Sequence, residues 1–181
     1  MANPVGDMAF SVVAVADLLA ADRRRVVSLC TRAFGRSFAG LFALVPPDST
    51  HLLARLDGRL VGHACWMTRW LQPGDLPPLR TAYVDAVAIA PDLQGHGLGS
   101  DLIARLNHEL AGFEIGGLST SRVTFYQRLG WQPWRGPTAV RTAGGLEPSS
   151  DDTIMILRTP QSPPLDLDGP LSIEWRAGSV W

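Results

Sequence analysis

The segment from residue 82 to residue 110 constrains the fold of this chain more than any other. It opens with a nearly continuous apolar run, AYVDAVAIA (82–90), which is typical of a strand buried within a sheet. Pro91 ends that strand, and the loop QGHGLGS leads into a helix whose leucines at 98, 102, 106 and 110 recur every four residues. The sequence therefore predicts a strand, a glycine-rich loop and an amphipathic helix in succession.

The loop contains three glycines, Gly95, Gly97 and Gly99. Glycine lets the backbone bend and leaves no side chain between the N–H groups and a ligand. Free N–H groups at the start of a helix, at the positive end of its dipole, can bind phosphate oxygens. A Walker loop does not fit, because the chain has no Lys, and a Rossmann loop needs G-x-G-x-x-G rather than G-x-G-x-G. A plain surface turn is the structural alternative.

Composition narrows the class of protein further. The length of 181 residues fits one domain (residues 1–181). The formal net charge of −1 gives no basic excess for binding nucleic acid. All 16 basic residues are Arg, so chemistry through a lysine Schiff base is excluded. The two cysteines, Cys30 and Cys65, have no CxxC partner, so we expect no disulfide framework, no bound metal and a reducing compartment.

The sequence gives no sign of a membrane or secretory segment. No stretch is apolar over the about 20 residues that a spanning helix needs. The N-terminus, MANPVGDMAF, has no positively charged region ahead of an apolar core, so we expect no signal peptide. A cytoplasmic protein without a membrane partner is the expectation.

Along the rest of the chain, apolar runs and turn signals alternate irregularly. The expected strands lie at 10–15, 52–56, 60–68, 115–118, 153–157 and 171–175, with another starting at Trp131, and the expected helices at 22–34 and 122–129. The Asp57-Gly58-Arg59 sequence predicts a hairpin turn, and 71–79 a Pro-rich loop. Because strands outnumber helices, the fold class expected is α+β (mixed α/β).

Two motifs in the right order resemble those of a known superfamily. The run Gln94-Gly95-His96-Gly97-Leu98-Gly99 resembles the acetyl-CoA motif of the GNAT N-acetyltransferases, and FYQRLGW (125–131) resembles a second element of that fold. The resemblance implies a central, mostly antiparallel sheet flanked by helices. Within the superfamily, the segments TAYVDAVAI, GLSTS, GWQPWRGPTAV followed by DDT, and WRAGSVW resemble the aminoglycoside 2′-N-acetyltransferases.

The resemblance implies acetyl-CoA as cosubstrate and assigns its contacts. The pantetheine arm would pair with the backbone at Val87 and Ile89. The pyrophosphate would rest on the amides from Gln94 to Ser100, that is Gln94, Gly95, His96, Gly97, Leu98, Gly99 and Ser100. His96 is more simply explained as an exposed spacer than as a catalyst.

Acetyl transfer needs an amine without its proton, a stabilised oxyanion and a leaving thiolate that receives a proton. Asp85 is the candidate base, acting through water; it could instead bind an ammonium group or be purely structural. The backbone N–H of Val87 is the candidate oxyanion donor. Tyr126 is the candidate acid, with a core aromatic role as its alternative.

A polycationic aminoglycoside needs carboxylates around it. Asp85, Asp152 and the terminal carboxylate of Trp181 are the candidates, with Ser119 and Ser179 as further substrate contacts; Asp151 and Asp152 could equally form a solvated loop pair. Members of the family that accept many aminoglycosides carry acids where this chain has RSFAGLF (36–42) and Ser179. We therefore expect a less cationic substrate, with kasugamycin first.

Several alternatives stay open. His63 and Cys65 share a strand face, and ordinary core packing explains them better than a thiol–imidazole pair. The enzyme could acetylate another small amine or a peptide N-terminus, and a non-catalytic acetyl-CoA-binding module is a third reading. The sequence does not decide whether the chain forms a homodimer.

Overall fold

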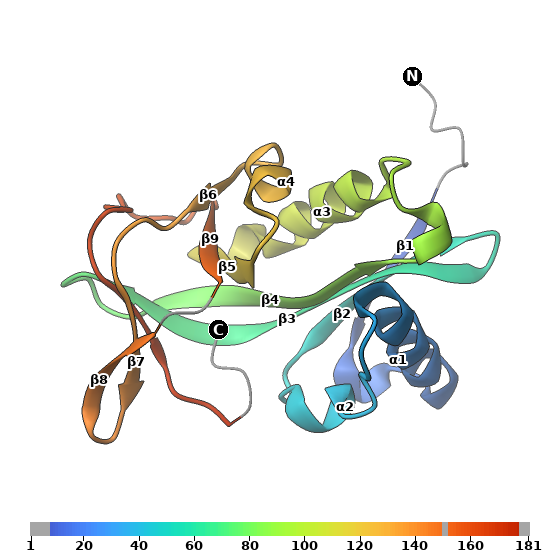
Figure 1. The fold of residues 1–181 in the computed structure, drawn as a ribbon, viewed down its shortest axis with the longest axis horizontal. Helices are drawn as coiled ribbons and strands as arrows, with labels where there is room; N and C mark the ends of the chain where they lie inside the picture. The colour runs from blue at the N-terminus through green and yellow to red at the C-terminus, as the bar shows by residue number, and fades with distance from the viewer. Residues whose placement is uncertain (1–7, 150–151, 178–181) are drawn as a thin grey trace. The chain divides into compact units, whose positions relative to one another are not determined.

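The computed structural model describes residues 8–149 and 152–177 (Figure 1). Contacts divide the chain into two compact units. Unit 1 takes its residues from 1–67 and 84–106, and unit 2 from 68–83 and 107–181. Strands β3 (Arg59–Pro73) and β4 (Leu79–Ile89) and helix α3 (Leu98–Glu109) each pass from one unit into the other.

Unit 1 is built on an antiparallel β1–β2–β3 arrangement. Its other elements are β1 (Ala9–Ala14), η1 (Val15–Asp17), α1 (Ala20–Phe34), α2 (Leu41–Leu44), β2 (Thr50–Leu56) and η2 (Pro91–Leu93). The predicted hairpin between β2 and β3 is confirmed, with Asp57 and Gly58 at φ 49° and 79°. Helix α1 ends at Gly35, which takes a left-handed conformation (φ 66°).

The two faces of the β2–β3 pair are covered differently (Figure 1). One face packs on α3, and a Cβ at Gly62 would lie 3.1 Å from the Ile89 side chain and 3.7 Å from Leu102. The other face packs on α1, where Cys30 approaches the ring of His63. The leucines predicted to line α3 are buried, since Leu98, Leu102 and Leu106 have no exposed surface.

Unit 2 contains strands in the order β6-β9-β5-β4-β3-β10-β7-β8. Its remaining elements are η3 (Leu110–Gly112), β5 (Ile115–Thr120), α4 (Val123–Gln127), β6 (Trp131–Pro133), β7 (Thr138–Thr142), β8 (Gly145–Ser149), β9 (Thr153–Arg158) and β10 (Leu171–Glu174). The β4–β5 and β10–β7 pairs are parallel. The other registered pairs are antiparallel, as the mostly antiparallel prediction requires.

The structure corrects several sequence-based boundaries. The Pro-rich loop expected at 71–79 is shorter, because β3 extends to Pro73 and β4 begins at Leu79. The sequence did not predict α2 or the β7–β8 hairpin. The helix expected at 122–129 spans only Val123–Gln127. No helix in the described ranges is both long enough and apolar enough to cross a lipid bilayer.

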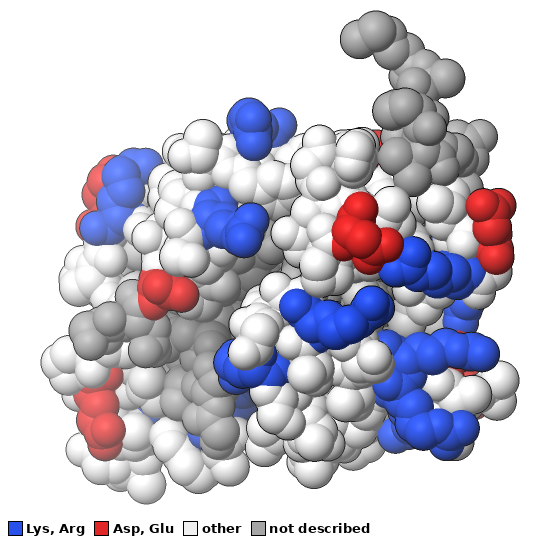
Figure 2. All heavy atoms as spheres, turned by 45° about the vertical axis from the view of Figure 1, so that its right-hand side comes forward, with Lys and Arg blue, Asp and Glu red and all other residues white. Residues whose placement is uncertain are grey.

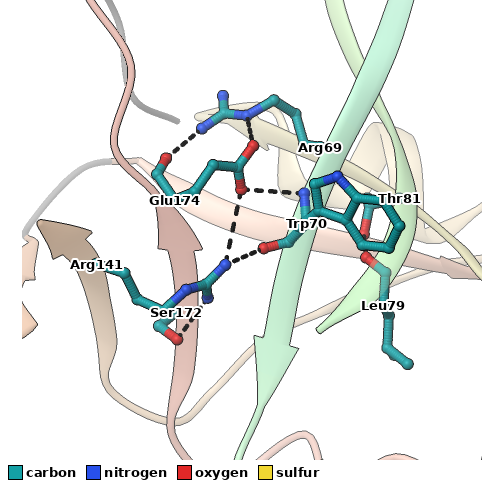
Figure 3. A network of polar contacts seen from close by, with 7 residues as sticks. All are labelled: Arg69, Trp70, Leu79, Thr81, Arg141, Ser172 and Glu174. Atoms are coloured by element: carbon teal, nitrogen blue, oxygen red, sulfur yellow. Dashed lines mark hydrogen bonds and ion pairs between the residues drawn. The ribbon is translucent and has the colours of Figure 1, made fainter. Parts of the chain in front are cut away.

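A charged cluster in unit 2 fixes β10 against its neighbours (Figure 3). The buried Arg69 donates through Nε to Glu174 Oε1 (2.5 Å) and through a second nitrogen to the Glu174 carbonyl oxygen (2.6 Å). The other carboxylate oxygen of Glu174 accepts from the Trp70 amide (3.0 Å). Arg141 donates to the Trp70 carbonyl and to Ser172 Oγ. These contacts hold β10 by its last residue.

Candidate active site

Strand β4 carries an irregularity at the candidate base. Ala86 has φ 51°, in the left-handed region that a residue with a Cβ seldom adopts. Its amide donates to Oδ1 of the half-buried Asp85 (2.6 Å), and its carbonyl oxygen lies 2.9 Å from His63 Nδ1. A Cys65 thiol contact reaches the Asp85 carbonyl oxygen (3.4 Å). The backbone on both sides of this residue is therefore fixed by side chains.

A chain of two buried histidines leads to that carbonyl. A carbonyl oxygen only accepts, so His63 Nδ1 carries the hydrogen, and its Nε2 accepts from His51 Nδ1 at 2.9 Å. His51 and His63 have no exposed surface. Within the described part of the chain, His51 Nε2 has no hydrogen-bond partner. The sequence analysis considered His63 and Cys65 but missed His51.

Burial keeps these groups uncharged. Burial lowers the pKa of His51 to about 3, with a further contribution from His63 and Arg23. Burial also lowers the pKa of His63 to about 4, although its bond to Ala86 opposes that shift. Burial, together with the charge of Asp85, raises the pKa of the Cys30 thiol to about 12. Cys30 is therefore a thiol at neutral pH, which argues against a nucleophilic role.

His51, His63 and Cys65 also form the group of potential metal ligands in the described residues. One ligand atom of each lies within 4.8 Å of the others. Two imidazoles and a thiol would suit Zn²⁺ or Cu⁺. However, the 2.9 Å between the two ring nitrogens is the distance of a hydrogen bond, in which a proton occupies the place between them.

The glycine loop after β4 has the backbone expected of a phosphate-binding turn. Gly95 and Gly97 adopt φ 82° and 87°, in the left-handed region that strongly favours glycine. Gln94 donates its side-chain amide to the Ile89 carbonyl (3.1 Å) and so ties the loop to the end of β4. The Ser100 amide already donates to the Gly97 carbonyl (2.8 Å), which leaves the amides before it better placed for an anion. His96 is exposed.

Unit 1 therefore brings Asp85, Val87 and Ile89 of β4 together with the loop at 94–100. Val87 is half-buried and Ile89 is buried. Leu98 and Gly99 form the first residues of α3, where backbone N–H groups have no partner within the helix. This arrangement can bind an anion at the loop and an extended amide-bearing chain along β4.

The other candidates belong to unit 2 or lie outside the described residues. Tyr126 of α4 is buried, and its ring makes edge contacts with Phe125 and Trp131 at 5.1 and 5.9 Å between centroids. Burial raises its pKa to about 12 against the opposing charge of Arg122. Ser119 is half-buried near the end of β5, and Asp152 is exposed. Asp151, Ser179 and Trp181 fall outside the described residues.

A separate cleft of about 510 Å³ lies in unit 1 between α1 and the β2–β3 turn. Its polar lining includes four arginines, Arg24, Arg25, Arg32 and Arg59. In Figure 2, which turns the right-hand side of Figure 1 forward, arginine side chains gather on this side. Guanidinium groups repel a cationic ligand, so this cleft does not suit an aminoglycoside.

The fold and the loop after β4 define a GNAT-type acetyltransferase. Residues 47–133 match the family described as Acetyltransferase (GNAT) domain. Eis1 from Mycobacterium abscessus shares the fold with a TM-score of 0.59 and 22% identity over 74% of this chain, which spans 33% of the Eis1 chain. YhbS from Escherichia coli, solved in complex with CoA, has a TM-score of 0.61 and 14% identity, covering 95% of this chain and 92% of its own.

A sequence relative narrows the family. The aminoglycoside 2′-N-acetyltransferase of Mycolicibacterium fortuitum is 34% identical over 131 residues, covering 68% of this chain and 67% of that protein. The chain belongs to the aminoglycoside 2′-N-acetyltransferase family of the GNAT superfamily. The family and the fold class predicted from the sequence are thereby confirmed.

Proposed function

We propose that this protein transfers the acetyl group of acetyl-CoA to the 2′-amino group of an aminoglycoside, with kasugamycin as the first candidate, and so confers resistance. The observation that carries the proposal is the left-handed glycine loop at Gly95 and Gly97, directly between β4 and α3. Similarity to a 2′-N-acetyltransferase supports the choice of substrate class. Acetyl-CoA is a cytoplasmic metabolite, so the proposal also places the enzyme in the cytoplasm.

The geometry of unit 1 supports the proposed cofactor contacts. The amides of Gly95, His96, Gly97, Leu98 and Gly99 would receive the pyrophosphate, helped by the dipole of α3. Gln94 and Ser100 would then shape the loop through their bonds to Ile89 and Gly97. The pantetheine arm would pair with the backbone of β4 at Val87 and Ile89. No metal takes part in this scheme.

In the proposed chemistry, the substrate ammonium loses a proton through water to Asp85, and the amine nitrogen attacks the thioester carbon. The Val87 N–H stabilises the oxyanion. The C–S bond then breaks, the thiolate takes up the second proton, which the nitrogen releases as the amide forms, and Asp85 returns the first proton to water. A thiol, with a pKa of about 8.5, is a stronger acid than the Tyr126 hydroxyl, so the hydroxyl does not need to give its proton to the leaving sulfur. Tyr126, whose pKa is about 12, therefore assists by donating a hydrogen bond to sulfur.

Substrate binding would involve the carboxylates of Asp85 and Asp152, with Ser119, Ser179 and Trp181 as further contacts. Asp152 is exposed and so is open to a soluble cation. The segment 36–42 contains no acidic residue, where broadly acting family members carry acids. Fewer carboxylates weaken the attraction for a highly charged drug more than for a substrate with few amines, which favours kasugamycin.

The test is release of CoA thiol with kasugamycin, gentamicin, tobramycin, polyamines and N-terminal peptides, followed by NMR of the acetylated product. Acetylation at the 2′-nitrogen supports the proposal, and faster turnover of a polyamine or peptide overturns it. Gentamicin turned over as efficiently as kasugamycin would refute the preferred substrate. CoA binding without turnover of any amine would indicate a non-catalytic module.

A matched pair of variants tests the role of Tyr126. Tyr126→Phe should lower kcat about 100-fold and leave CoA affinity unchanged, because only the hydroxyl is removed. Tyr83→Phe removes the hydroxyl of the other tyrosine and should keep kcat. Equal kcat in the two variants would remove Tyr126 from the mechanism.

A further inference from the structure

The backbone at Ala86 has an unusual conformation that its neighbours must stabilise. Ala86 is not glycine, yet it has φ 51° in the middle of a strand. Residues in such sparsely populated conformations persist only where their surroundings fix them, and they cluster at functional sites. Its neighbours on either side are Asp85 and Val87, the proposed base and oxyanion donor. A small rotation at Ala86 would turn both groups.

Three side chains of unit 1 hold this peptide from the α1 side of the sheet. His63 Nδ1 donates to the Ala86 carbonyl at 2.9 Å. Cys30 Sγ lies 3.7 Å from the same ring nitrogen and 4.0 Å from the same carbonyl oxygen. Cys65 contacts the Asp85 carbonyl oxygen at 3.4 Å. Of these contacts, only the imidazole bond has the length of a strong hydrogen bond.

The contact with His51 supports one of the two neutral tautomers of His63. A neutral imidazole has one donor and one acceptor nitrogen. Because the Ala86 carbonyl oxygen accepts from His63 Nδ1, the 2.9 Å contact between the rings is a hydrogen bond only when His51 Nδ1 carries its hydrogen, so both bonds favour the same tautomer of His63. Without that donor, His63 could carry its hydrogen on Nε2 and present a lone pair to the carbonyl oxygen, which would repel it.

We infer that His51 and His63 are positioning residues, which act through the Ala86 carbonyl to hold Asp85 and Val87 in the geometry that acetyl transfer needs. This inference rests on the proposed function, because it gives Asp85 and Val87 their roles. Both histidines are wholly buried, so their effect on the reaction would pass through neighbouring groups. Their contribution is the orientation of two neighbouring groups, and a misplacement of about 1 Å can cost about 100-fold in rate.

The central test compares two replacements of His63. His63→Leu removes the donor and should lower kcat about 100-fold with CoA affinity unchanged. His63→Asn places an amide N–H near the position of Nδ1 and should recover most of kcat. Leu53→Ala truncates the buried cross-strand partner of His63 without touching a polar group, so it should lower stability but not kcat. A kcat equally low in His63→Asn and His63→Leu overturns the inference.

A double-mutant comparison isolates the role of His51. His51→Leu should lower kcat about 10-fold in the wild-type background, because the His63 tautomer is no longer fixed. In the His63→Asn background the same change should cost no further kcat, since an amide has no second tautomer. An equal loss of kcat in both backgrounds overturns the inference, because it would show a purely structural effect.

Two further measurements separate this inference from its premise. Hydrogen exchange of the amides at 84–89 should accelerate in His63→Leu and not in Leu53→Ala, which needs no substrate; unchanged exchange overturns the inference. If hydrogen exchange accelerates in His63→Leu but no amine is acetylated, the proposed function is wrong while the role of His63 in holding the backbone stands. Metal analysis of the purified protein should find no stoichiometric zinc or copper; a metal lost in His51→Leu overturns the inference, because it would occupy the nitrogen lone pair.

Discussion

Two clusters of polar side chains hold strands in this protein: one is neutral and wholly buried, and the other is charged and partly exposed. In unit 1, neutral His51 and His63 hold the backbone of β4 at Ala86. In unit 2, Arg69 and Glu174 hold β10 through charged bonds. The side chains of Arg69 and Glu174 are 3% and 34% exposed, whereas both histidines are wholly buried. Charge is kept where one partner reaches water, because full desolvation of an ion pair is costly.

Because the histidines are neutral and buried, the free energy of unfolding should depend on pH, and this is the largest change in stability that we expect. The folded-state pKa values of about 3 and about 4 lie below the ordinary value of 6.5, so the unfolded chain binds protons first as the pH falls. The free energy of unfolding should therefore be at its maximum above pH 6.5 and decrease as the pH falls below that value. Each histidine contributes about 1.4 kcal/mol per pH unit, or about 4 kcal/mol together between about pH 6 and 4.5.

Urea unfolding at a series of pH values measures this slope. The double variant His51→Leu with His63→Asn lacks both titrating groups and should flatten it. Arg69→Leu leaves both histidines in place and should keep it. A slope that survives the loss of both histidines would show that other groups cause the acid sensitivity.

The charged cluster should respond most strongly to loss of its buried member. Arg69→Leu removes the guanidinium that donates to both the Glu174 carboxylate and its carbonyl and leaves only the more distant Arg141 at 3.8 Å, so the free energy of unfolding should fall by about 3 kcal/mol. The control is Arg135→Leu, which breaks an ion pair with Asp168 whose side chains are 55% and 64% exposed. That control should leave the urea midpoint unchanged, and an equal shift in both variants would refute the role of burial.

Replacing the carboxylate rather than the guanidinium should cost less. Glu174→Gln keeps one oxygen that can accept from the Trp70 amide or from Arg69, but its amide hydrogens face cationic donors. We expect a loss of about 2 kcal/mol in the free energy of unfolding, measured by urea titration. Raising the salt concentration should weaken the wild type toward the variant if charge is the cause. Insensitivity of both proteins to salt would contradict this explanation.

The sequence predicted those parts of the site that depend on local chemistry. Gly95 and Gly97 predicted a loop in which the backbone bends, and in the structure both take a left-handed conformation, which glycine adopts freely. His51 was missed because its position depends on register. Continuing the β2–β3 hairpin from Leu56 opposite Arg59 without interruption would place His51 against Ala64. A bulge at Ala54/Arg55 moves it opposite Cys65 and onto the face of His63.

The same limit applies to Ala86 and to the β7–β8 hairpin. An alanine in a nearly continuous apolar run carries no signal of a positive φ, and its contact with His63 joins residues 23 positions apart in the sequence. Most of β8 is exposed, so its sequence needs no alternation of apolar and polar residues. Without that alternation the sequence does not predict the β7–β8 hairpin. Strand β4 and helix α3 were predicted well because a nearly continuous apolar run marks the strand and a leucine every four residues marks the helix.

Cys30→Ala should have the smallest effect on the free energy of unfolding. It distinguishes the packing contact of Cys30 with the Ala86 carbonyl from the hydrogen bond that His63 makes to the same oxygen. Sγ lies 3.7 Å from His63 and 4.0 Å from the Ala86 carbonyl, so its removal deletes packing but leaves the 2.9 Å imidazole bond intact. The free energy of unfolding should fall by about 1 kcal/mol, as for other single buried atoms, and kcat should not change. A thiol that mattered for orientation would show instead as a loss of kcat in the thiol-release assay. Because Cys30 and His63 approach the same carbonyl from α1 and β3, this variant separates proximity to Ala86 from the one bond that fixes it.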